Sequence, residues 1–403
     1  MAEQIKSLKT GIKYKDTPIG RIPVDWEVTS LGQILTFEYG ESLPEVLRKD
    51  GKTNVYGSNG IIGRHDKYLV YGPGLIIGRK GTVGAIAWSK DDFWPIDTTY
   101  YVSARQTKED LRWLYYLLLS SRLEKLNAST GVPGLNRDIV YSEIIPLPPL
   151  VEQKKIAEIL STVDEAIEKT DQIIEKTKEA KKGLMRRLLT RGIDHKKFKD
   201  TEIGNIPAEW AVVKLRDVVK QFYNGGTPNT NNKRYWNGNI PWITGADFGE
   251  DQNVIQIRRH ITEEGLKNSA TNVIPQGNLL VVTRTGVGKV AIAPFNITIS
   301  QDITGIIFNS SKALPEYVYW YFNHNTQKLV SLVQGTSING ILRGDLSSVI
   351  IPLPSIAEQK MIAAILFSIT QEIEKETRQK EQLQSTKTGI MQVLLTGKIR
   401  VKA

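Results

Sequence analysis

A tandem duplication is the feature that most constrains this chain. The motif Ile-Pro-Leu-Pro-x-x-x-Glu-Gln-Lys occurs at residues 145–154 and again at 351–360, an offset of 206. The motif Asp-Thr-x-Ile-Gly-x-Ile-Pro-x-x-Trp occurs at 16–26 and at 200–210, an offset of 184. An entry segment, a globular segment, a strand and a long helix therefore follow one another twice. Two such copies predict an internal pseudo-two-fold repeat rather than a solenoid.

A long helix is predicted after each Ile-Pro-Leu-Pro strand. Residues 151–190 contain no proline and one glycine, and their apolar positions alternate spacings of four and three, which is typical of a coiled coil. Both helices end on Leu-Leu-Thr followed closely by glycine, and Ser355 with Glu358 forms a capping-box pattern in the second. We call the repeating positions the seam; its apolar members are Ile156, Leu160, Val163, Ile167, Ile174, Leu184 and Leu188 in the first helix, and Ile362, Leu366, Ile369, Ile373, Leu383, Ile390 and Leu394 in the second.

The two helices are predicted to pair with each other. A helical hairpin that merely closes one core needs a short connection, whereas about 165 residues separate these helices. They are therefore expected to lie between two globular segments. Polar residues interrupt the middle of the seam, and in an antiparallel pair Glu376 and Lys380 are expected opposite Thr170 and Lys181.

Composition excludes several classes of protein. The 403 residues are enough for two or three domains, each with its own core. The chain has no cysteine, and its four histidines show no metal-ligand spacing, so disulfides and thiolate metal sites are excluded. It has no signal sequence and no apolar run of 18 residues, so we expect a soluble, cytoplasmic protein. The net charge of +10 is spread along the chain and is only weak evidence for a nucleic-acid partner.

Each globular segment contains a predicted strand, glycine-rich turn and strand, at 75–88 and at 279–293, followed by a helical stretch at 108–127 or 315–333. The turns fit no nucleotide-binding motif, because Val290 follows Gly288-Lys289 where a phosphate-binding loop needs Ser or Thr. Basic turns of this kind can contact nucleic-acid phosphates, although a plain hairpin would look similar. The candidates in these turns are Arg79, Lys80, Thr82, Arg284, Thr285 and Lys289.

Polar loops supply the remaining candidate DNA contacts. Residues 224–239 contain six asparagines beside basic and aromatic residues, and carboxamides and guanidinium groups pair with base edges. A surface loop rich in Asn and Gly would show the same composition. From this loop region we select Thr227, Asn229, Asn231, Lys233, Arg234 and Trp242; from the first segment Tyr56, Ser58, Asn59 and Arg64; and from the loops before the Ile-Pro-Leu-Pro strands Asn136, Arg137, Thr336, Ser337, Asn339 and Arg343.

Motifs for catalysis are missing from the sequence. It contains no Asn/Asp-Pro-Pro-Tyr/Phe methyltransferase motif, no nuclease set, no nucleophile elbow and no HExxH zinc motif. The residues therefore predict a non-catalytic binding protein without a bound cofactor or metal. Two other classes remain possible: a coiled-coil adaptor that holds proteins, and an enzyme that uses the glycine-rich turns to bind a small ligand.

The duplicated entry motif, the duplicated helix start and the Leu-Leu-Thr helix ends resemble the specificity subunits of type I restriction–modification enzymes. The resemblance covers essentially the whole chain. It implies an α+β fold with two α/β target recognition domains, separated by two long antiparallel helices that form a coiled coil. The corresponding segments are 1–150 and 194–354 for the domains, and 151–193 and 355–403 for the helices.

The same resemblance implies a function and partners. Each recognition domain is expected to bind one half of a bipartite site in double-stranded DNA. Two methyltransferase (modification) subunits are expected on the helices, and ATP-dependent restriction (endonuclease) subunits complete the complex. S-adenosylmethionine and ATP belong to those partners, so no cofactor is expected on this chain. The family pattern does not identify individual base-contacting residues.

Overall fold

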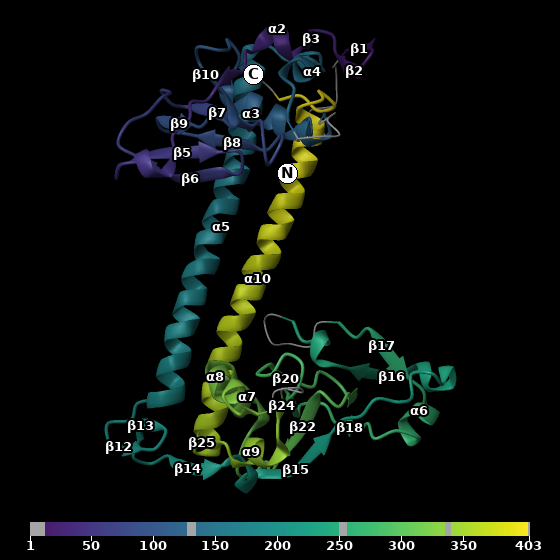
Figure 1. The fold of residues 1–403 in the computed structure, drawn as a ribbon. Coiled ribbons are helices and arrows are strands. Elements are labelled where there is room, and N and C mark those ends of the chain that lie inside the picture. Colours follow the sequence, from purple (N-terminus) through teal and green to yellow (C-terminus); the bar gives the residue numbers. More distant parts are fainter. Residues whose placement is uncertain (1–12, 127–133, 250–255, 335–339, 402–403) are drawn as a thin grey trace. The chain divides into compact units, whose positions relative to one another are not determined.

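The computed structural model describes residues 13–126, 134–249, 256–334 and 340–401. The chain divides into two compact units: unit 1 is Met1–Gln172 with Thr377–Ala403, and unit 2 is Ile173–Glu376. Each unit contains one mixed α/β domain and one half of each long helix (Figure 1). The expected α+β class and the internal repeat are confirmed.

Unit 1 is built on two small sheets. The first has the antiparallel order β4-β10-β7-β8, and the second has the order β6-β5-β9, in which β5 pairs in parallel with β9. Helix α3 packs on β7 and β8. The bounds are β4 Glu38–Tyr39, β5 Thr53–Gly57, β6 Gly60–His65, β7 Gly74–Gly78, β8 Ile86–Ser89, β9 Phe93–Pro95, β10 Thr99–Ser103 and α3 Leu111–Ser120.

Unit 2 repeats this arrangement, with one further strand, β18, in its second sheet. Its first sheet has the order β15-β22-β19-β20, and its second sheet has the order β17-β16-β21-β18, with β16 parallel to β21. Helix α7 covers β19 and β20 as α3 covers β7 and β8. The bounds are β15 Val219–Asn224, β16 Trp236–Ile243, β17 Arg259–Ile261, β18 Val273–Ile274, β19 Leu279–Val282, β20 Val290–Ile292, β21 Ile297–Ile299, β22 Ile303–Phe308 and α7 Pro315–His324.

The repeated motifs form the connections around these sheets. Each entry motif is a hairpin, and each Ile-Pro-Leu-Pro segment is a strand paired antiparallel with the strand that follows the hairpin. These strands are β1 Tyr14–Thr17, β2 Gly20–Pro23, β3 Glu27–Ser30 and β11 Ile144–Leu147 in unit 1, and β12 Phe198–Thr201, β13 Gly204–Pro207, β14 Ala211–Lys214 and β25 Ile350–Leu353 in unit 2. Further short elements in the described residues are α2 Leu31–Ile34, α4 Arg137–Tyr141, α6 Glu263–Lys267, α8 Thr326–Val330, α9 Arg343–Ser348, β23 Val333–Gln334 and β24 Gly340–Ile341.

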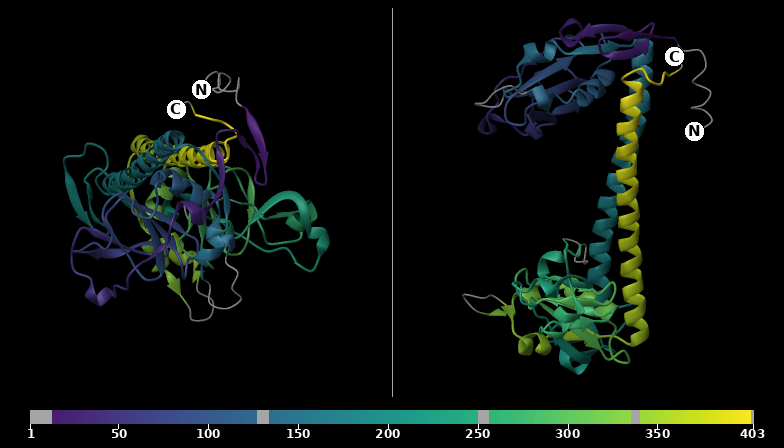
Figure 2. Two further views of the ribbon diagram at one scale, coloured as in Figure 1. Left: turned by 90° about the horizontal axis from the view of Figure 1, so that it is seen from above. Right: turned by 90° about the vertical axis from the view of Figure 1, so that its right-hand side faces the viewer.

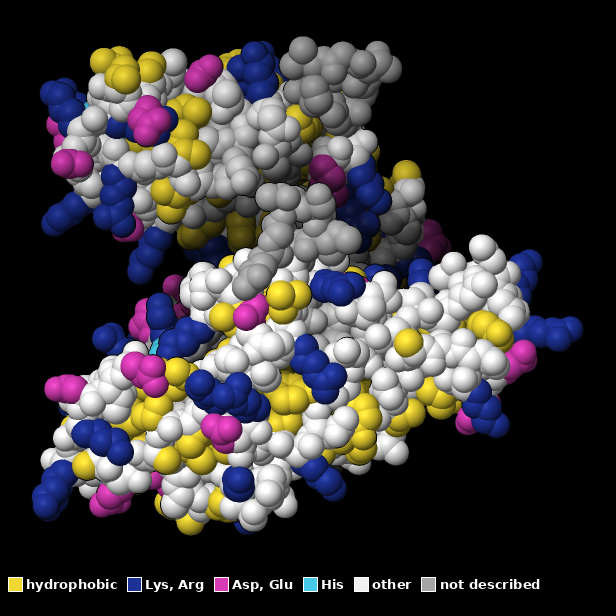
Figure 3. All heavy atoms as spheres, turned by 60° about the horizontal axis from the view of Figure 1, so that its bottom comes forward, with side chains coloured by type: hydrophobic (Ala, Val, Ile, Leu, Met, Phe, Trp, Pro, Cys, Tyr) yellow, Lys and Arg dark blue, Asp and Glu magenta, His cyan; other side chains and the backbone are white. Residues whose placement is uncertain are grey.

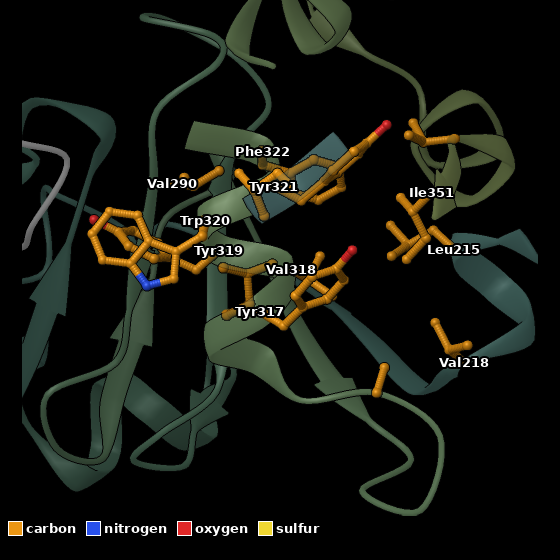
Figure 4. Packing of buried hydrophobic residues seen from close by; sticks show 14 of the residues in the cluster. Leu215, Val218, Val290, Tyr317, Val318, Tyr319, Trp320, Tyr321, Phe322 and Ile351 are labelled. Atoms are coloured by element: carbon orange, nitrogen blue, oxygen red, sulfur yellow. The ribbon is translucent and has the colours of Figure 1, made fainter. Parts of the chain in front are cut away.

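The helices that follow the sheets are shorter than the sequence pattern suggested. Helix α3 begins after Asp110, whose carboxylate accepts a hydrogen bond from Trp113 N at 2.8 Å, and the chain leaves the helix before Arg122, which has a φ of 49°. In unit 2 the predicted single helix 315–333 is divided at Asn325 into α7 and α8. All six residues from Tyr317 to Phe322 are buried in one cluster (Figure 4). The same cluster contains residues of β19 and of both long helices, so no face of α7 is left to solvent.

The two long helices are α5, Leu150–Arg191, and α10, Ile356–Leu394, which confirms the predicted pair. In each unit the two helix halves lie side by side in all three ribbon views (Figures 1 and 2). In unit 1, Asp164 pairs with Lys387 at 2.6 Å and Asp171 with Lys380 at 2.5 Å. A step of seven residues along α5 thus matches a step of seven backwards along α10, so the helices are antiparallel.

Burial along both helices follows the seam. Every predicted seam residue is buried or half-buried, and most residues between the seam positions are exposed. In the polar middle, Thr170 is buried, and Lys380 pairs with Asp171, the residue that follows Thr170. Lys181 also contacts α7, because its ammonium group lies 5.1 Å from the centre of the Trp320 ring.

A buried carboxylate explains why the two sequence motifs recur together. Glu152, at the start of α5, accepts a hydrogen bond at 2.9 Å from the indole of Trp26 in the entry segment. Glu358, at the start of α10, accepts the equivalent bond from Trp210, also at 2.9 Å. The predicted capping box is therefore only half formed, because Ser355 caps the amide of Glu358 while the Glu358 carboxylate is held by Trp210.

The remaining partners of the two carboxylates differ. Glu358 also accepts from the amide of Ile193 at 3.0 Å and contacts His195 Nε2 at 2.9 Å. Glu152 instead accepts from the guanidinium of Arg400, whose Nε lies 3.1 Å away. The C-terminal segment of unit 1 thus supplies a guanidinium group where the segment after α5 supplies the imidazole of His195 in unit 2.

Replacing Glu358 by alanine should lower the free energy of unfolding by about 2–4 kcal/mol, because the substitution leaves the buried indole of Trp210 and the amide of Ile193 without an acceptor. Glu358→Gln keeps an acceptor and should lose less. Urea titration followed by tryptophan fluorescence and circular dichroism measures both. The control is Glu372→Ala, which removes an exposed carboxylate from the same helix; equal stability of E358A and E372A would contradict the prediction.

Candidate nucleic-acid interface

Three segments of unit 1 that are distant in sequence meet at the carbonyl of Thr98. The amides of Arg79 and Lys80, in the glycine-rich turn, donate to it at 2.9 and 3.1 Å. Ser58, in the turn between β5 and β6, donates its hydroxyl at 2.8 Å. Glycine is required at Gly78, where a Cβ would lie 2.2 Å from the Thr82 carbonyl oxygen and 3.0 Å from that of Ser58. The predicted candidates Ser58, Arg79 and Lys80 thus lie close together.

Two arginines of this cluster pack on one exposed aromatic ring. The guanidinium carbon of Arg79 lies 5.2 Å from the centre of the Tyr39 ring, and that of Arg137 lies 5.5 Å from it. Arg79 is further fixed by a 2.7 Å hydrogen bond from Nη2 to the Asp97 carbonyl oxygen. Planar cations held in this way suit phosphate or base-edge contacts. Tyr39 was not predicted, because only the pairing of β4 with β10 brings it here.

The loop before β11 joins the same cluster. The amide of Leu135 donates to the Arg79 carbonyl oxygen at 2.9 Å, and the hydroxyl of Tyr100 donates to the Leu135 carbonyl oxygen at 3.1 Å. Burial is the main cause that raises the pKa of Tyr100 to about 12, so this hydroxyl stays a donor at neutral pH. Asn136 is exposed, and its side chain caps α4 by accepting from the amide of Asp138 at 2.8 Å.

Unit 2 repeats the same connections with other side chains. The amides of Thr283 and Arg284 donate to the Asp302 carbonyl oxygen at 2.7 and 3.2 Å, and the amide of Ile341 donates to Thr283 at 2.8 Å. Arg343 packs on an aromatic ring of the edge strand β15, with its guanidinium carbon 5.7 Å from the centre of the Phe222 ring. The glycine-rich turn and the loop before the Ile-Pro-Leu-Pro strand are therefore adjacent in both units.

The asparagine-rich loop of unit 2 is held by local hydrogen bonds. The side chain of Asn229 accepts from the amide of Asn231 at 3.0 Å, and its carbonyl oxygen accepts from the Trp236 indole at 3.1 Å. Thr227 donates its hydroxyl to the side chain of Gln301. The loop thereby leaves its cations exposed, with Lys233 and Arg234 on the surface.

A second group of basic residues in unit 2 carries no recognisable sequence motif. Arg258, Arg259 and His260 line a surface hollow of about 550 Å³ together with Trp236. Arg258 is held by the buried carboxylate of Asp247 at 2.7 Å. Burial favours the neutral acid, but the hydrogen bonds from Arg258 and Thr244 outweigh it and lower the pKa of Asp247. Asp247 therefore stays ionised at neutral pH and keeps Arg258 in place.

Several of the predicted DNA-contact residues are not exposed to solvent or are not described by the structure. Tyr56 and Trp242 are buried at 5% and 2% exposure, so their rings belong to the core. Lys289 is half-buried and donates to the Phe248 carbonyl oxygen at 3.1 Å. Thr336, Ser337 and Asn339 lie outside the described residues. The exposed candidates are Asn59, Arg64, Lys80, Thr82, Asn136, Asn229, Asn231, Lys233, Arg234, Arg284, Thr285 and Arg343.

Charge alone does not mark the interface. On the face of unit 2 that Figure 3 brings forward, lysine and arginine side chains are scattered among neutral and hydrophobic ones. Within the described residues no cluster of His, Asp and Glu has the geometry of a metal site. No described helix is long and apolar enough to span a membrane.

Comparison with known proteins identifies the class. The model of the type I restriction modification DNA specificity domain matches residues 23–179 and 207–385, one copy for each repeat. The chain belongs to this family: it is a DNA specificity subunit of type I restriction–modification systems, with two target recognition domains. Members of this family recognise DNA and are not themselves catalytic.

Individual relatives agree over the full length. A Methanocaldococcus jannaschii protein, provisionally named the MjaX type I restriction enzyme specificity subunit, is 33% identical over 96% of this chain and 97% of its own. The MjaVIII specificity subunit of the same organism is 30% identical over 95% of both chains. The S subunit structure from M. genitalium matches the fold with a TM-score of 0.66 at 15% identity, covering 96% of this chain and 97% of that one.

Substituting Arg79 by alanine should weaken binding of the full chain to its DNA site. If Arg79 contacts a base edge, its loss should cost about 1–3 kcal/mol of binding free energy and relax specificity at one base pair. If it contacts a phosphate, its loss should weaken binding to all sequences equally and reduce the slope of log affinity against log salt concentration by about one. Fluorescence anisotropy at graded salt distinguishes the two. Arg21→Ala, which removes an exposed arginine of the entry hairpin, is the control; R79A binding as tightly as R21A at every salt concentration would contradict the prediction.

Proposed function

We propose that this chain binds a bipartite site in double-stranded DNA, each recognition domain contacting one half-site. The observation that carries the proposal is the repeated connection of the glycine-rich turn with the loop before the Ile-Pro-Leu-Pro strand, at Arg79–Leu135 in unit 1 and Thr283–Ile341 in unit 2. Two copies of one arrangement, each with exposed cations and carboxamides, suit two separate stretches of duplex.

We further propose that α5 and α10 carry the partner subunits: two methyltransferase subunits, and restriction subunits that complete the nuclease. Met361, Ile365 and Phe367 of α10 are between 39% and 49% exposed, although they are apolar. Phe367 lines a mostly apolar hollow of about 520 Å³ in unit 2, with Leu314 and Ala363. Exposed apolar groups of this kind are typical of protein interfaces. S-adenosylmethionine and ATP belong to the partners, and this chain binds no cofactor.

The test uses the chain together with its methyltransferase partner and S-adenosylmethionine. Mapping methylated adenines across a genome or a random duplex library should give one bipartite sequence with an unspecified spacer. The purified chain alone should transfer no methyl group. Pull-down of protein partners without sequence-specific methylation or DNA binding would instead support a coiled-coil adaptor.

Exchange of one domain should change one half-site only. Replacing residues 16–144 by the equivalent segment of a relative leaves the second sheet pair and its core intact, because each unit has its own buried cluster. Methylation mapping should then show a new first half-site and an unchanged second. Loss of both specificities in a chimera whose circular dichroism is native would contradict independent recognition.

The helices should set the spacing between the half-sites. Deleting Thr170–Lys176 and Glu376–Gln382 together removes one heptad from each helix and leaves the seam in register. At about 1.5 Å per residue the pair shortens by roughly 10 Å, which corresponds to about three base pairs of B-DNA.

The preferred spacer should therefore decrease by about three base pairs while both half-sites stay the same. Methylation assays on duplexes of graded spacing measure the change. A control chain that lacks only one heptad loses the register and should lose stability. If the double deletion folds and binds its partners but prefers the same DNA spacer as the wild type, the helices do not set the spacing between the half-sites.

A further inference from the structure

The second sheet of each unit carries an equivalent antiparallel hairpin. In unit 1 it is formed by β5 and β6, and in unit 2 by β16 and β17. In both, the inner strand also pairs in parallel with a third strand, β9 or β21. The outer strands β6 and β17 are thus the same element in the two repeats, placed at an edge of the sheet.

The outer strand of unit 1 exposes two neighbouring isoleucines. Ile61 is 58% exposed and Ile62 is 41% exposed. Alternation along a regular strand would turn one of them inward. Here the register shifts between Val55 and Tyr56, and such a bulge redirects side chains. Ile62 lies over Gly57, where an added Cβ would be 3.1 Å from its Cγ2 atom.

These isoleucines are continuous with the candidate interface. Gly57 precedes Ser58, whose hydroxyl is bound to the Thr98 carbonyl oxygen together with the amides of Arg79 and Lys80. The exposed Asn59 forms the tip of the hairpin, and Arg64 follows on the same outer strand. An apolar pair flanked by groups suited to phosphate and base-edge contacts fits the one apolar group in the major groove, the 5-methyl of thymine.

The equivalent strand of unit 2 has the opposite chemistry. Arg259 begins this strand with its guanidinium carbon 5.7 Å from the centre of the Trp236 ring, and Arg258, directly before the strand, is held by Asp247. Arginines in fixed orientation favour guanine, which presents O6 and N7 as paired acceptors. Different chemistry on an element that both repeats share is expected if that element determines which bases are bound.

We infer that the outer hairpins are the base-selective elements of the two domains: Ile61 and Ile62 contact a thymine methyl in one half-site, and Arg258 or Arg259 contacts a guanine in the other. This inference rests on the proposed DNA-binding function and adds the bases selected. The two can be tested separately. If the chain binds a bipartite site without these contacts, the proposed function stands and this inference is wrong.

The test begins with the full chain and its methylation-mapped site. Each thymine is replaced singly by deoxyuridine, which lacks only the methyl group, and affinities are measured by anisotropy. At one position in the half-site of unit 1 the replacement should lower the affinity about fourfold, the value expected for one buried methyl-sized group. In Ile61→Ala or Ile62→Ala the same replacement should cost nothing. Ile19→Ala, an exposed isoleucine of the entry hairpin, should keep the wild-type response.

The second part of the test replaces each guanine singly by 7-deazaguanine, which lacks the N7 acceptor. One guanine in the half-site of unit 2 should become sensitive, and the sensitivity should disappear in Arg258→Ala or Arg259→Ala. Deoxyuridine in that half-site should have no effect that depends on Ile61 or Ile62.

The wild-type measurements decide the outcome even if a variant folds poorly. A half-site for unit 1 without thymine, or a full deoxyuridine scan without an effect, would overturn the thymine assignment. A half-site for unit 2 without guanine, or insensitivity to 7-deazaguanine, would overturn the guanine assignment. Effects that persist unchanged in folded isoleucine or arginine variants would show that other residues select these bases.

Discussion

A buried hydrogen bond between a glutamate and a tryptophan holds each repeat together. Trp26 and Trp210 donate to Glu152 and Glu358, which are 1% and 7% exposed, so each carboxylate needs all its partners. The bond fixes the start of a long helix against the entry segment of the same unit. The glutamine that follows each glutamate fixes the helix to the start of α3 or α7, through Asp110 N and Leu314 N. The domain is thereby attached to the helix at a defined angle.

Because these buried contacts hold each domain on its helix, the exposed side chains of the two domains are free to differ. The first sheets of the two units have the same strand order, the second sheets share three strands, and the turns that meet at Thr98 and Asp302 are equivalent, yet the exposed side chains differ. Ile61 and Ile62 lie on the outer strand in unit 1, whereas the outer strand in unit 2 begins with Arg259, which packs on Trp236. A scaffold whose stability depends on buried contacts tolerates such changes, because exposed positions contribute little to folding.

The candidate interface was only partly predictable. The polar turns around Ser58, Arg79 and Arg284 were identified, because glycine-rich basic turns have a recognisable composition. Burial could not be judged from composition, so Tyr56 and Trp242 were selected although they belong to the core. Arg258 and Arg259 were missed because nothing near them in sequence marks a site; Trp236 and Asp247 become their neighbours only through strand pairing and folding.

The sequence by itself determined the duplication, the two long helices and their seam, because repeated motifs and a regular apolar spacing are local patterns that persist in any fold containing them. Only the tertiary structure decided which side chains meet. The register that pairs Asp164 with Lys387, the use of Glu358 by Trp210 instead of a complete capping box, and the contact of Lys181 with Trp320 all depend on long-range packing. Such contacts join residues between about 140 and 220 positions apart, a separation at which local patterns carry no information.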